Sequence, residues 1–339
     1  MSEISEMRKI LQQMMTNDRI GCVLGAAAEL DFFAQIADHP QTAAQLAENV
    51  ETDLRATTFL LDALVAIGVF AKNRETTPPI YSICESYFPL LAPSDPQTFV
   101  PMLLHHINYI RKWTQLARIA KSGKPWEAEE SIRGREEDYK SFILAMNSIA
   151  ITLAEPTIAQ LQEAGLTNFK HLLDIGGASG TYTRAFLKAL PGIKATLFDL
   201  PPAVEEAKKK FAGTEYENRV SLVAGNFYTD PLPQGADFAW ISAIIHQFDR
   251  VHAVDLYRKT AEALETGGMI AVRDHVLNAD GVSPVEGVLF AVNMLAGTET
   301  GMCYTFDEIR EDLETAGFKD VKLAIATDNM NSVVTAIKK

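Results

Sequence analysis

The spacing of hydrophobic residues changes about halfway along the chain. Up to about residue 90, apolar residues recur mostly every three or four positions, which is typical of helices. From about residue 155 to the end, short apolar runs alternate with helical segments. Such alternation favours a parallel sheet with helices on both faces, so we expect an α/β domain in the second half.

Seven apolar runs in this second half have the length of strands. Five come first and are expected to be separated by helices, and the last two form a closing pair. The candidate strands are 171–175, 194–198, 220–224, 236–241, 268–273, 318–325 and 332–337.

The N-terminal region is predicted to be helical with one small hairpin. Arg8 to Ala37 has helical spacing in two segments, and Gly21 and Gly25 would let another helix pack closely. Thr42 and Asp53 are typical N-cap residues of two further helices.

Two short strands are expected after these helices, at 69–70 and 81–83. Three helices and a hairpin indicate a winged helix, which suggests either DNA binding or dimerisation. Residues 1–90 hold 6 Lys+Arg against 12 Asp+Glu, and this acidic balance favours dimerisation.

A helical segment from 95 to about 165 connects the two regions and is rich in large side chains. Core packing is the simplest explanation, and a roof over a flat apolar substrate is the alternative. His105 and His106 point about 100° apart on a helix, so the pair does not suggest a metal site. The large side chains are His105, His106, Tyr109, Trp113, Trp126, Tyr139, Phe142 and Met146.

Composition limits the class of protein. The 339 residues are 47% hydrophobic and 22% charged, which is typical of a globular protein, and the net charge of -13 argues against nucleic acid as a partner. Three cysteines have no metal-ligand spacing and suggest a reducing compartment. The N-terminus lacks a signal-peptide core and no run of 18 apolar residues exists, so we expect a cytoplasmic protein without a membrane span or a bound metal.

A glycine-rich turn follows the first candidate strand. Asp174 lies next to last in the apolar run, and Gly176, Gly177 and Gly180 follow before a helical segment. Glycines let the backbone turn sharply and approach a ligand closely. In an open α/β sheet, ligands bind at the carboxyl ends of the strands, so we expect a binding site here.

This turn does not match the dinucleotide fingerprint, which needs glycines at its first, third and sixth positions. Counted from Gly176, those positions hold Ala178 and Thr181, and counted from Gly177 the pattern fails at Ser179. A nucleoside without phosphates suits the turn better, which favours S-adenosylmethionine (SAM). A nicotinamide cofactor and a turn without a ligand remain alternatives.

The ends of the next strands supply further candidate cofactor contacts. Asp199 follows the second strand, where its carboxylate can accept hydrogen bonds from both ribose hydroxyls. Gly225, Asn226 and Phe227 follow the third strand. Asn226 is a candidate partner for the adenine amino group, and Phe227 for packing on the ring.

His246 and Asp274 follow the fourth and fifth strands. His246 is either a packed histidine that caps the next helix or a general base, because imidazole titrates near neutral pH. Asp274 would lie at the neighbouring strand end and could accept the other ring N–H, which fixes the tautomer. His252 and His275 are expected to be surface or packing residues.

Several motifs together resemble the SAM-dependent small-molecule O-methyltransferases of the caffeate/hydroxyindole type, including bacterial polyketide and antibiotic members. The motifs are TAAQLAENVETDLRATTFLLDALVAIGVF, LLDIGGASG, LFDLP, IIHQF, RDHVL and YTFDEIREDLETAGF. They cover nearly the whole chain. The resemblance implies a class I methyltransferase Rossmann-like seven-stranded sheet, preceded by a mostly α winged-helix dimerisation domain, and a homodimer.

The resemblance also implies domains and roles. A dimerisation domain would span 1–95, a helical bridge lining the substrate pocket 96–160, and the SAM-binding catalytic domain 161–339. His246 would be the base and Asp274 its support. The cofactor would contact Asp174, Gly176, Gly177, Gly180, Asp199, Leu200, Gly225, Asn226, Phe227 and Ser242. The substrate would contact Phe142, Met146, Asn147, Gln247, Asn293 and Met294.

The chain departs from the family pattern near the implied base. Gln247 stands where the family usually has Asp, and Phe248 where it has Trp. Cys303 aligns with a second supporting glutamate, with Glu299 out of register, and Ser242 replaces a lysine. These changes leave three alternatives open: O-methylation, C-methylation or non-methylating chemistry on the same cofactor, and a DNA-binding regulator with a ligand-sensing α/β domain.

Overall fold

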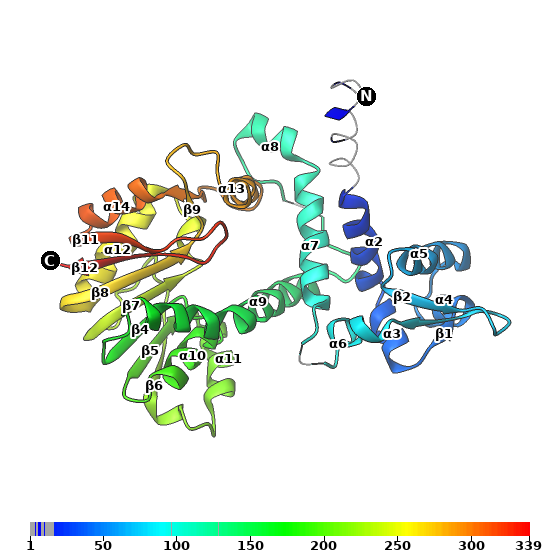
Figure 1. Ribbon diagram of the computed structural model, residues 1–339, viewed down its shortest axis with the longest axis horizontal. Helices are drawn as coiled ribbons and strands as arrows, with labels where there is room; N and C mark the ends of the chain where they lie inside the picture. The colour runs from blue at the N-terminus through cyan, green and yellow to red at the C-terminus, as the bar shows by residue number, and fades with distance from the viewer. Residues whose placement is uncertain (1–3, 5, 8–9, 11–16, 96, 128) are drawn as a thin grey trace. The chain divides into compact units, whose positions relative to one another are not determined.

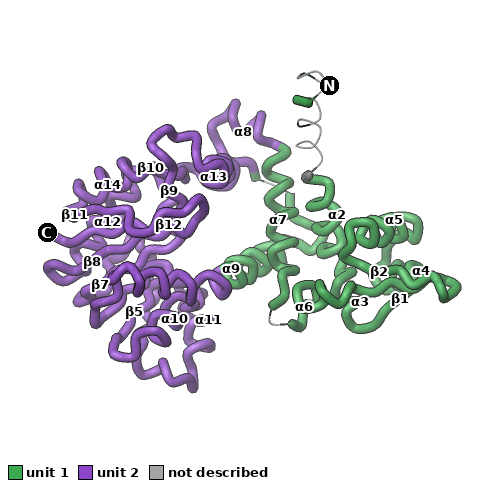
Figure 2. Tube along the Cα trace, viewed as in Figure 1, with its two compact units in different colours: residues 1–114, 127–149 green, residues 115–126, 150–339 purple. Residues whose placement is uncertain are grey.

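The computed structural model describes residues 4, 6–7, 10, 17–95, 97–127 and 129–339 (Figure 1). Contacts divide the chain into two units (Figure 2). The first comprises residues 1–114 and 127–149, and the second comprises 115–126 and 150–339. The functional boundaries at 95 and 160 stay a prediction.

The first unit is helical around a small antiparallel sheet of order β1-β3-β2. Thr42 and Asp53 cap α4 and α5 as predicted, and each side chain accepts a hydrogen bond from the backbone N–H three residues on. The predicted helical residues 8–9 and 11–16 lie outside the described part of the chain. The elements are α2 (Asn17–Glu29), α3 (Phe32–Asp38), β1 (Gln41–Thr42), α4 (Ala43–Asn49), α5 (Leu54–Ala66), β2 (Phe70–Asn73), β3 (Ile80–Ile83), η1 (Glu85–Tyr87), α6 (Phe88–Leu91) and α7 (Val100–Trp113).

Gly21 and Gly25 allow α2 to pack closely on α7, as the sequence suggests. A Cβ atom on Gly21 would lie 2.9 Å from Nε2 of His106, and one on Gly25 would lie 2.5 Å from Cβ of Ile107. Any larger side chain would therefore push these two helices apart. This requirement explains two glycines within a helix, where glycine is otherwise unfavourable.

Helix α9 (Arg135–Glu163) contributes to both units and is unusually apolar on its surface. By length and composition alone it is long and apolar enough to cross a membrane, and only 22% of its most apolar 18-residue window is buried. Three acidic residues occupy its first turn. The exposed large apolar residues of α9 are Tyr139, Phe142, Ile143, Leu144, Met146, Ile149 and Ile151.

The second unit is built on a seven-stranded sheet of order β11-β12-β8-β7-β4-β5-β6. The five strands β4 to β8 are mutually parallel, as predicted. The predicted closing pair, β11 and β12, is present, and its two strands are antiparallel to each other. Helices cover the sheet on both faces (Figure 1). The strands are β4 (His171–Ile175), β5 (Lys194–Asp199), β6 (Val220–Ala224), β7 (Ala236–Ser242), β8 (Leu264–Asp274), β11 (Phe318–Ile325) and β12 (Ser332–Lys338), with a separate pair β9 (Val276–Leu277) and β10 (Tyr304–Thr305).

The helices of this unit follow the predicted alternation with one exception. No helix separates β6 from β7, although one was expected between each of the first five strands. Pro231, Pro233 and Gly235 fall in this connection. Proline lacks a backbone donor and breaks helices, so the segment stays a loop. The helices are α8 (Leu116–Ser122), α10 (Thr181–Ala189), α11 (Pro201–Phe211), η2 (Glu217–Arg219), η3 (Ile245–Gln247), α12 (Arg250–Ala263), α13 (Val285–Gly297) and α14 (Phe306–Thr315).

The strand order reverses at β4, and this position determines where a ligand fits. From β4 the chain proceeds outward through β5 and β6, and then returns to pair β7 on the other side of β4. Connections on opposite faces leave a crevice at the carboxyl ends of the two central strands. The glycine turn follows β4 directly, so the fold places it at this crevice.

Candidate active site

The glycine turn after β4 is shaped first by contacts with the protein itself. Gly176 and Gly180 have φ angles of 73° and 82°, which are unfavourable for other residues. A Cβ atom would lie 2.6 Å from Cδ1 of Ile244 at Gly176, and 2.5 Å from Cε2 of Phe211 at Gly180. The turn therefore lies tightly between β4, the segment after β7 and α11.

Gly177 and Gly225 are also close-packed. A Cβ atom would lie 2.8 Å from Cγ of Leu197 at Gly177, and 2.5 Å from Cε2 of Phe198 at Gly225. Both leucine and phenylalanine belong to β5. Glycine at these positions thus lets the turns after β4 and β6 approach the strand that lies between them.

Asp199, at the end of β5, joins the glycine turn to the next connection. Its two carboxylate oxygens accept hydrogen bonds from the backbone N–H of Ala178 (2.7 Å) and of Leu200 (2.6 Å). Burial raises the pKa of Asp199, and these two hydrogen bonds oppose the rise. No ion pair involves Asp199 in the described chain. Its remaining lone pairs are therefore suited to hydroxyl donors.

Asp174 is a buried carboxyl group beneath the turn. It is 2% exposed and accepts a hydrogen bond of 2.5 Å from Oγ1 of Thr183 on α10. Burial raises its pKa to about 7, and the charge of Asp199 adds to this rise while Thr183 opposes it. The ionised form of Asp174 is therefore unfavourable in the folded chain at neutral pH.

We expect Asp174→Asn to stabilise the ligand-free protein at alkaline pH. The pKa of Asp174 is about 7 in the folded chain against an ordinary value of 3.8, so the stabilising contribution of the protonated group is lost as pH rises through this interval. The difference corresponds to at most about 4 kcal/mol. Thermal unfolding at pH 5 and pH 8.5 should show a larger gain in melting temperature at pH 8.5. Equal gains at both values would contradict the buried-acid explanation.

Asn226 and Phe227 follow β6 and border the same edge of the sheet. Oδ1 of Asn226 accepts a hydrogen bond from the backbone N–H of Tyr228 at 3.0 Å, so this side chain also stabilises its own turn. The Phe227 ring lies 5.8 Å from the ring of Phe248 and 5.1 Å from that of Tyr228. Their contacts with adenine stay a prediction.

His246 and Asp274 form the central pair of the site. Nδ1 of His246 lies 2.9 Å from both carboxylate oxygens of Asp274, although the residues are 28 positions apart. The sequence suggested this contact, and the structure has it. Helix α12 is capped by Asp249 and not by His246, so the capping alternative for this histidine is wrong. The catalytic roles of the pair stay a prediction.

The surroundings of Asp274 favour its ionised form. Burial alone would raise the pKa of Asp274, but the charge and hydrogen bond of His246 and the backbone N–H of His275 outweigh it, and the pKa lies below its usual value. An ionised carboxylate accepts the Nδ1–H of His246. When the ring is neutral and Nδ1 carries its hydrogen, Nε2 has the free lone pair that a general base requires.

Two aromatic contacts that the sequence did not suggest enclose this pair. The Phe290 ring of α13 lies edge-on to His246, with ring centres 4.9 Å apart. The His275 ring packs on Phe290 at 4.7 Å and is buried, as expected of a packing residue. The only sequence signal for Phe290 was its place in an apolar helix, which does not distinguish it from a core residue.

Cys303 lies near the same carboxylate. It is buried, and burial together with the charge of Asp274 raises the pKa of its thiol to about 12. Cys303, which the resemblance predicts to replace a supporting glutamate, is therefore a neutral thiol. Asp274 is consequently the acidic group that contacts His246 among the described residues.

The residues predicted to line the substrate pocket fall into two groups. Asn293 and Met294 are buried on α13, and Gln247 is exposed next to the base. A hollow of about 320 Å³ borders Gln247, together with Tyr228, Phe248, His252, Thr298, Glu299 and Thr300. Phe142, Met146 and Asn147 belong to the first unit, on α9. Their role in the pocket stays a prediction.

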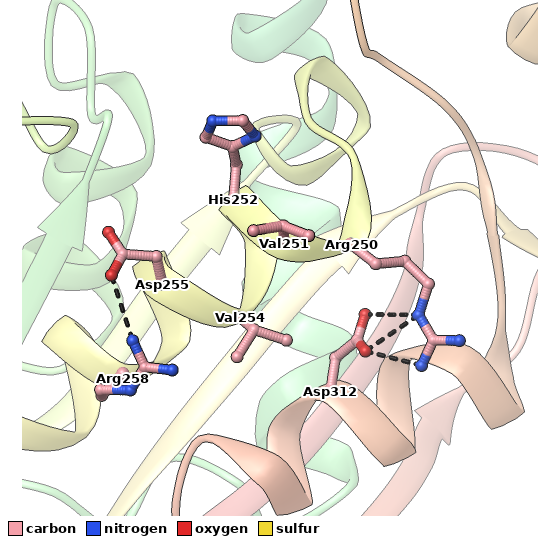
Figure 3. A pocket seen from close by; sticks show the side chains of 7 residues that line it. All are labelled: Arg250, Val251, His252, Val254, Asp255, Arg258 and Asp312. Atoms are coloured by element: carbon pink, nitrogen blue, oxygen red, sulfur yellow. Dashed lines mark hydrogen bonds and ion pairs between the residues drawn. The ribbon is translucent and has the colours of Figure 1, made fainter.

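A second hollow of about 500 Å³ lies on the outer surface of α12 (Figure 3). It is lined by Arg250, Val251, His252, Val254, Asp255, Arg258 and Asp312. The Arg250 guanidinium donates to both oxygens of Asp312 across it, at 2.6 to 3.2 Å. This ion pair joins α12 to α14, and His246 and Asp274 do not line the hollow, so we assign it a structural role.

Ser242, at the end of β7, accepts a hydrogen bond of 3.0 Å from Nη1 of Arg273. Sequence reasoning considered Ser242 but missed Arg273. A charged residue inside an otherwise apolar strand was the signal, because such a side chain is rarely buried without a purpose.

Comparisons with known proteins agree with this architecture. Residues 121–319, more than half of the chain, match the O-methyltransferase domain, and residues 13–85 match the O-methyltransferase dimerisation domain. The chain is 28% identical to an acetylserotonin O-methyltransferase of Bos taurus, with 95% of each chain covered. It is 27% identical to the tetracenomycin polyketide synthesis 8-O-methyl transferase TcmO of Streptomyces glaucescens, with 88% of this chain and 87% of that protein covered.

A solved structure shares the fold over almost the whole length. The crystal structure of human N-acetylserotonin methyltransferase in complex with SAM superposes with a TM-score of 0.81 at 25% identity, covering 98% of this chain and 97% of that chain. The predicted Rossmann-like methyltransferase sheet is confirmed, as is the resemblance on which it rested. With its domain matched over residues 121–319, the chain belongs to the O-methyltransferase family.

Proposed function

We propose that this enzyme methylates a hydroxyl group of a small aromatic molecule with SAM as methyl donor and His246 as general base. The observation that carries the proposal is the His246–Asp274 pair, with Nδ1 2.9 Å from both carboxylate oxygens at the carboxyl edge of the sheet. The relatives named above are an acetylserotonin O-methyltransferase and an 8-O-methyl transferase of polyketide synthesis, which supports an oxygen acceptor.

The residues around the glycine turn fit SAM. Asp199 is ionisable, lies at the second strand end and has acceptor capacity for the ribose hydroxyls. Tyr182 is buried beside the turn, and its hydroxyl group forms no hydrogen bond of normal geometry within the described chain. These groups offer one acceptor and one donor where a nucleoside with an amino-acid tail would need them. Bound SAM supplies a methyl group on a sulfonium centre.

The protein residues supply alignment and a proton acceptor. Nε2 of His246 accepts the proton of the substrate hydroxyl as the oxygen becomes nucleophilic, and Asp274 stabilises the resulting imidazolium. Phe290 packs against the imidazole, and His246 is largely buried, which limits the access of water to the ring. Alignment of two reactants contributes about 7–11 kcal/mol, so most of the rate enhancement comes from positioning.

A second candidate function keeps the cofactor and changes the chemistry. Cys303 is a protonated thiol where a supporting acid would stand, and Gln247 is a neutral amide beside the base. Fewer acids near His246 would suit C-methylation or a reaction without methyl transfer. An NMR spectrum of the product distinguishes these cases, because a new methyl on oxygen excludes both.

We further propose a cytoplasmic homodimer formed through the N-terminal winged-helix domain, without nucleic acid or membrane as partner. The match to the dimerisation domain and the exposed apolar residues of α9 support this assembly, because exposed patches of this kind mark interaction sites. Sedimentation of the purified chain is expected to give twice the monomer mass, and a stable monomer would contradict the proposal.

The function is tested by incubating the purified protein with methyl-labelled SAM and a panel of phenols, hydroxyindoles and hydroxylated polyketides. We expect label transfer to oxygen in at least one class of acceptor and micromolar binding of S-adenosylhomocysteine in calorimetry. A protein that binds neither SAM nor S-adenosylhomocysteine would refute the proposal.

A further inference from the structure

Arg273 is a buried cation whose hydrogen-bond partners are neutral. The side chain lies at the end of β8 and is 2% exposed. Its guanidinium donates to Oγ of Ser242 (3.0 Å) and, from Nε and Nη2, to Oδ1 of Asn331 (3.0 and 2.6 Å). It also lies 5.3 Å from the ring centre of Tyr182. Three hydrogen bonds to two side chains orient the group without neutralising its charge.

No carboxylate forms an ion pair with Arg273 in the described part of the chain. Asp274 is adjacent in sequence, but both of its oxygens contact His246, and side chains of successive strand residues point to opposite faces of a sheet. Burial lowers the pKa of Arg273, and the charge of Asp274 opposes this change without reversing it. A buried charge without a partner is costly, and proteins normally pair it with an opposite charge.

The surroundings of this guanidinium suit an anion. The buried Tyr182 hydroxyl lies close to the hydroxyls of Thr157 and Ser242, and its pKa is raised mainly by burial while Arg273 opposes the rise. Hydroxyl groups donate hydrogen bonds to an anion and carry no negative charge of their own. The cluster therefore combines one full positive charge with several neutral donors.

The cluster also lies next to the glycine turn. Ser242 is paired with Arg273 across β7 and β8, and Ile241 is paired with Ile175, the last residue of β4. Gly176 then contacts Ile244, two residues after Ser242. Tyr182 belongs to the first turn of α10, directly after the glycines. Arg273 thus lies two strands from β4 on the side of the turn opposite to Asp199, which ends β5.

We propose that Arg273 binds the carboxylate at the amino-acid end of the cofactor. This inference rests on the proposed use of SAM. Asp199 holds the ribose on one side of the glycine turn, so the amino-acid end extends toward β7 and β8, where the guanidinium lies. The carboxylate is the negatively charged partner that Arg273 does not have in the protein alone. Binding of the cofactor therefore offsets the free-energy cost of burying the guanidinium.

The test compares two ligands by calorimetry on the full-length protein. S-adenosylhomocysteine carries the carboxylate, whereas 5′-methylthioadenosine keeps the adenosine and thioether and lacks the amino-acid end. Arg273→Met is expected to weaken binding of S-adenosylhomocysteine about 10- to 100-fold, which is the effect of losing a hydrogen-bonded charge. Binding of 5′-methylthioadenosine should change less than about 2-fold, and Arg273→Lys should retain part of the discrimination.

The melting temperature is a second measurement, and it distinguishes a binding role of Arg273 from a structural one. Without ligand, Arg273→Met removes an unpaired buried charge, so its melting temperature should equal or exceed that of the wild type. A marked fall in melting temperature together with equal losses for both ligands would assign Arg273 a structural role and overturn the inference. Unchanged affinity for S-adenosylhomocysteine would also overturn it.

Two further outcomes separate this inference from the proposed function. Arg273→Met could leave the cofactor affinity unchanged and raise KM only for acceptors that carry a carboxylate. Arg273 would then bind the substrate and not the cofactor, which would overturn this inference but not the use of SAM. A wild-type protein that binds 5′-methylthioadenosine and S-adenosylhomocysteine equally well would also overturn it while SAM use stands. Failure of the wild type to bind either ligand would refute both proposals.

Discussion

His246→Ala is expected to lower kcat for methyl transfer to a hydroxyl by about 10²–10⁴-fold, the range that one positioned base contributes. Nε2 of His246 carries the lone pair because Nδ1–H donates to Asp274, and alanine removes the acceptor while leaving the carboxylate in place. The affinity for S-adenosylhomocysteine should stay within about 2- to 3-fold, since His246 is not among the proposed cofactor contacts. Steady-state kinetics and calorimetry measure the two quantities separately.

Rescue by free imidazole is a control for the role of His246, because imidazole should restore activity only if the histidine acts as a base. The cavity left by His246→Ala can accept free imidazole, and part of the lost rate should return with its concentration. His39→Ala changes an exposed histidine of the first unit and should leave the rate unchanged. A His246→Ala enzyme with wild-type turnover would remove the base from the mechanism.

Asp199→Ala should weaken binding of S-adenosylhomocysteine by about 10²–10⁴-fold, because each hydrogen bond to a charged group contributes about 1.5–3 kcal/mol and the ribose offers two. The same carboxylate holds the backbone N–H groups of Ala178 and Leu200, so part of the loss comes from a looser glycine turn. Calorimetry with the purified variant gives the combined effect.

An analogue without ribose hydroxyls separates the two contributions. For 2′,3′-dideoxy-S-adenosylhomocysteine the loss on Asp199→Ala should shrink to the contribution of the turn alone. Equal losses for both ligands would show that Asp199 acts only on the backbone. Glu205→Ala, a change at an exposed residue of the adjacent α11, is the matched control and should bind both ligands as the wild type does.

Local sequence signals were sufficient for most elements of the second unit. Strands β4 and β6 have the predicted bounds, and β5, β7 and β12 differ from prediction by one residue at one end. Apolar runs of five to seven residues between turn signals leave little choice of structure. Strand β8 begins at Leu264, four residues before its prediction. Leu264 is buried and pairs with Ala236 of β7, but the next three residues are exposed and interrupt the apolar run.

The helix expected between β6 and β7 is absent from the structure, because the strand–helix alternation does not continue through this connection. An alternating arrangement suggested a helix between β6 and β7, but Pro231 and Pro233 interrupt that connection. Pro231 and Pro233 are two residues apart, and each lacks the backbone N–H that a helix needs, whereas the long helix α9 tolerates the single Pro156. The caps at Thr42 and Asp53, in contrast, were correct, because a side chain that accepts from a backbone N–H three residues on is a local interaction.

By itself, the sequence determined the parallel sheet, the glycine turn at the end of its first strand and the candidate acid–base residues, since hydrophobic spacing and turn residues act over short distances. Only the tertiary structure decided which of these side chains meet. His246 reaches Asp274 across 28 positions, and Arg273 reaches Asn331 across 58. Such contacts depend on the order of the strands, which brings distant residues together. Burial then changes the free energy of a charged group far more than the residues next to it in the sequence do.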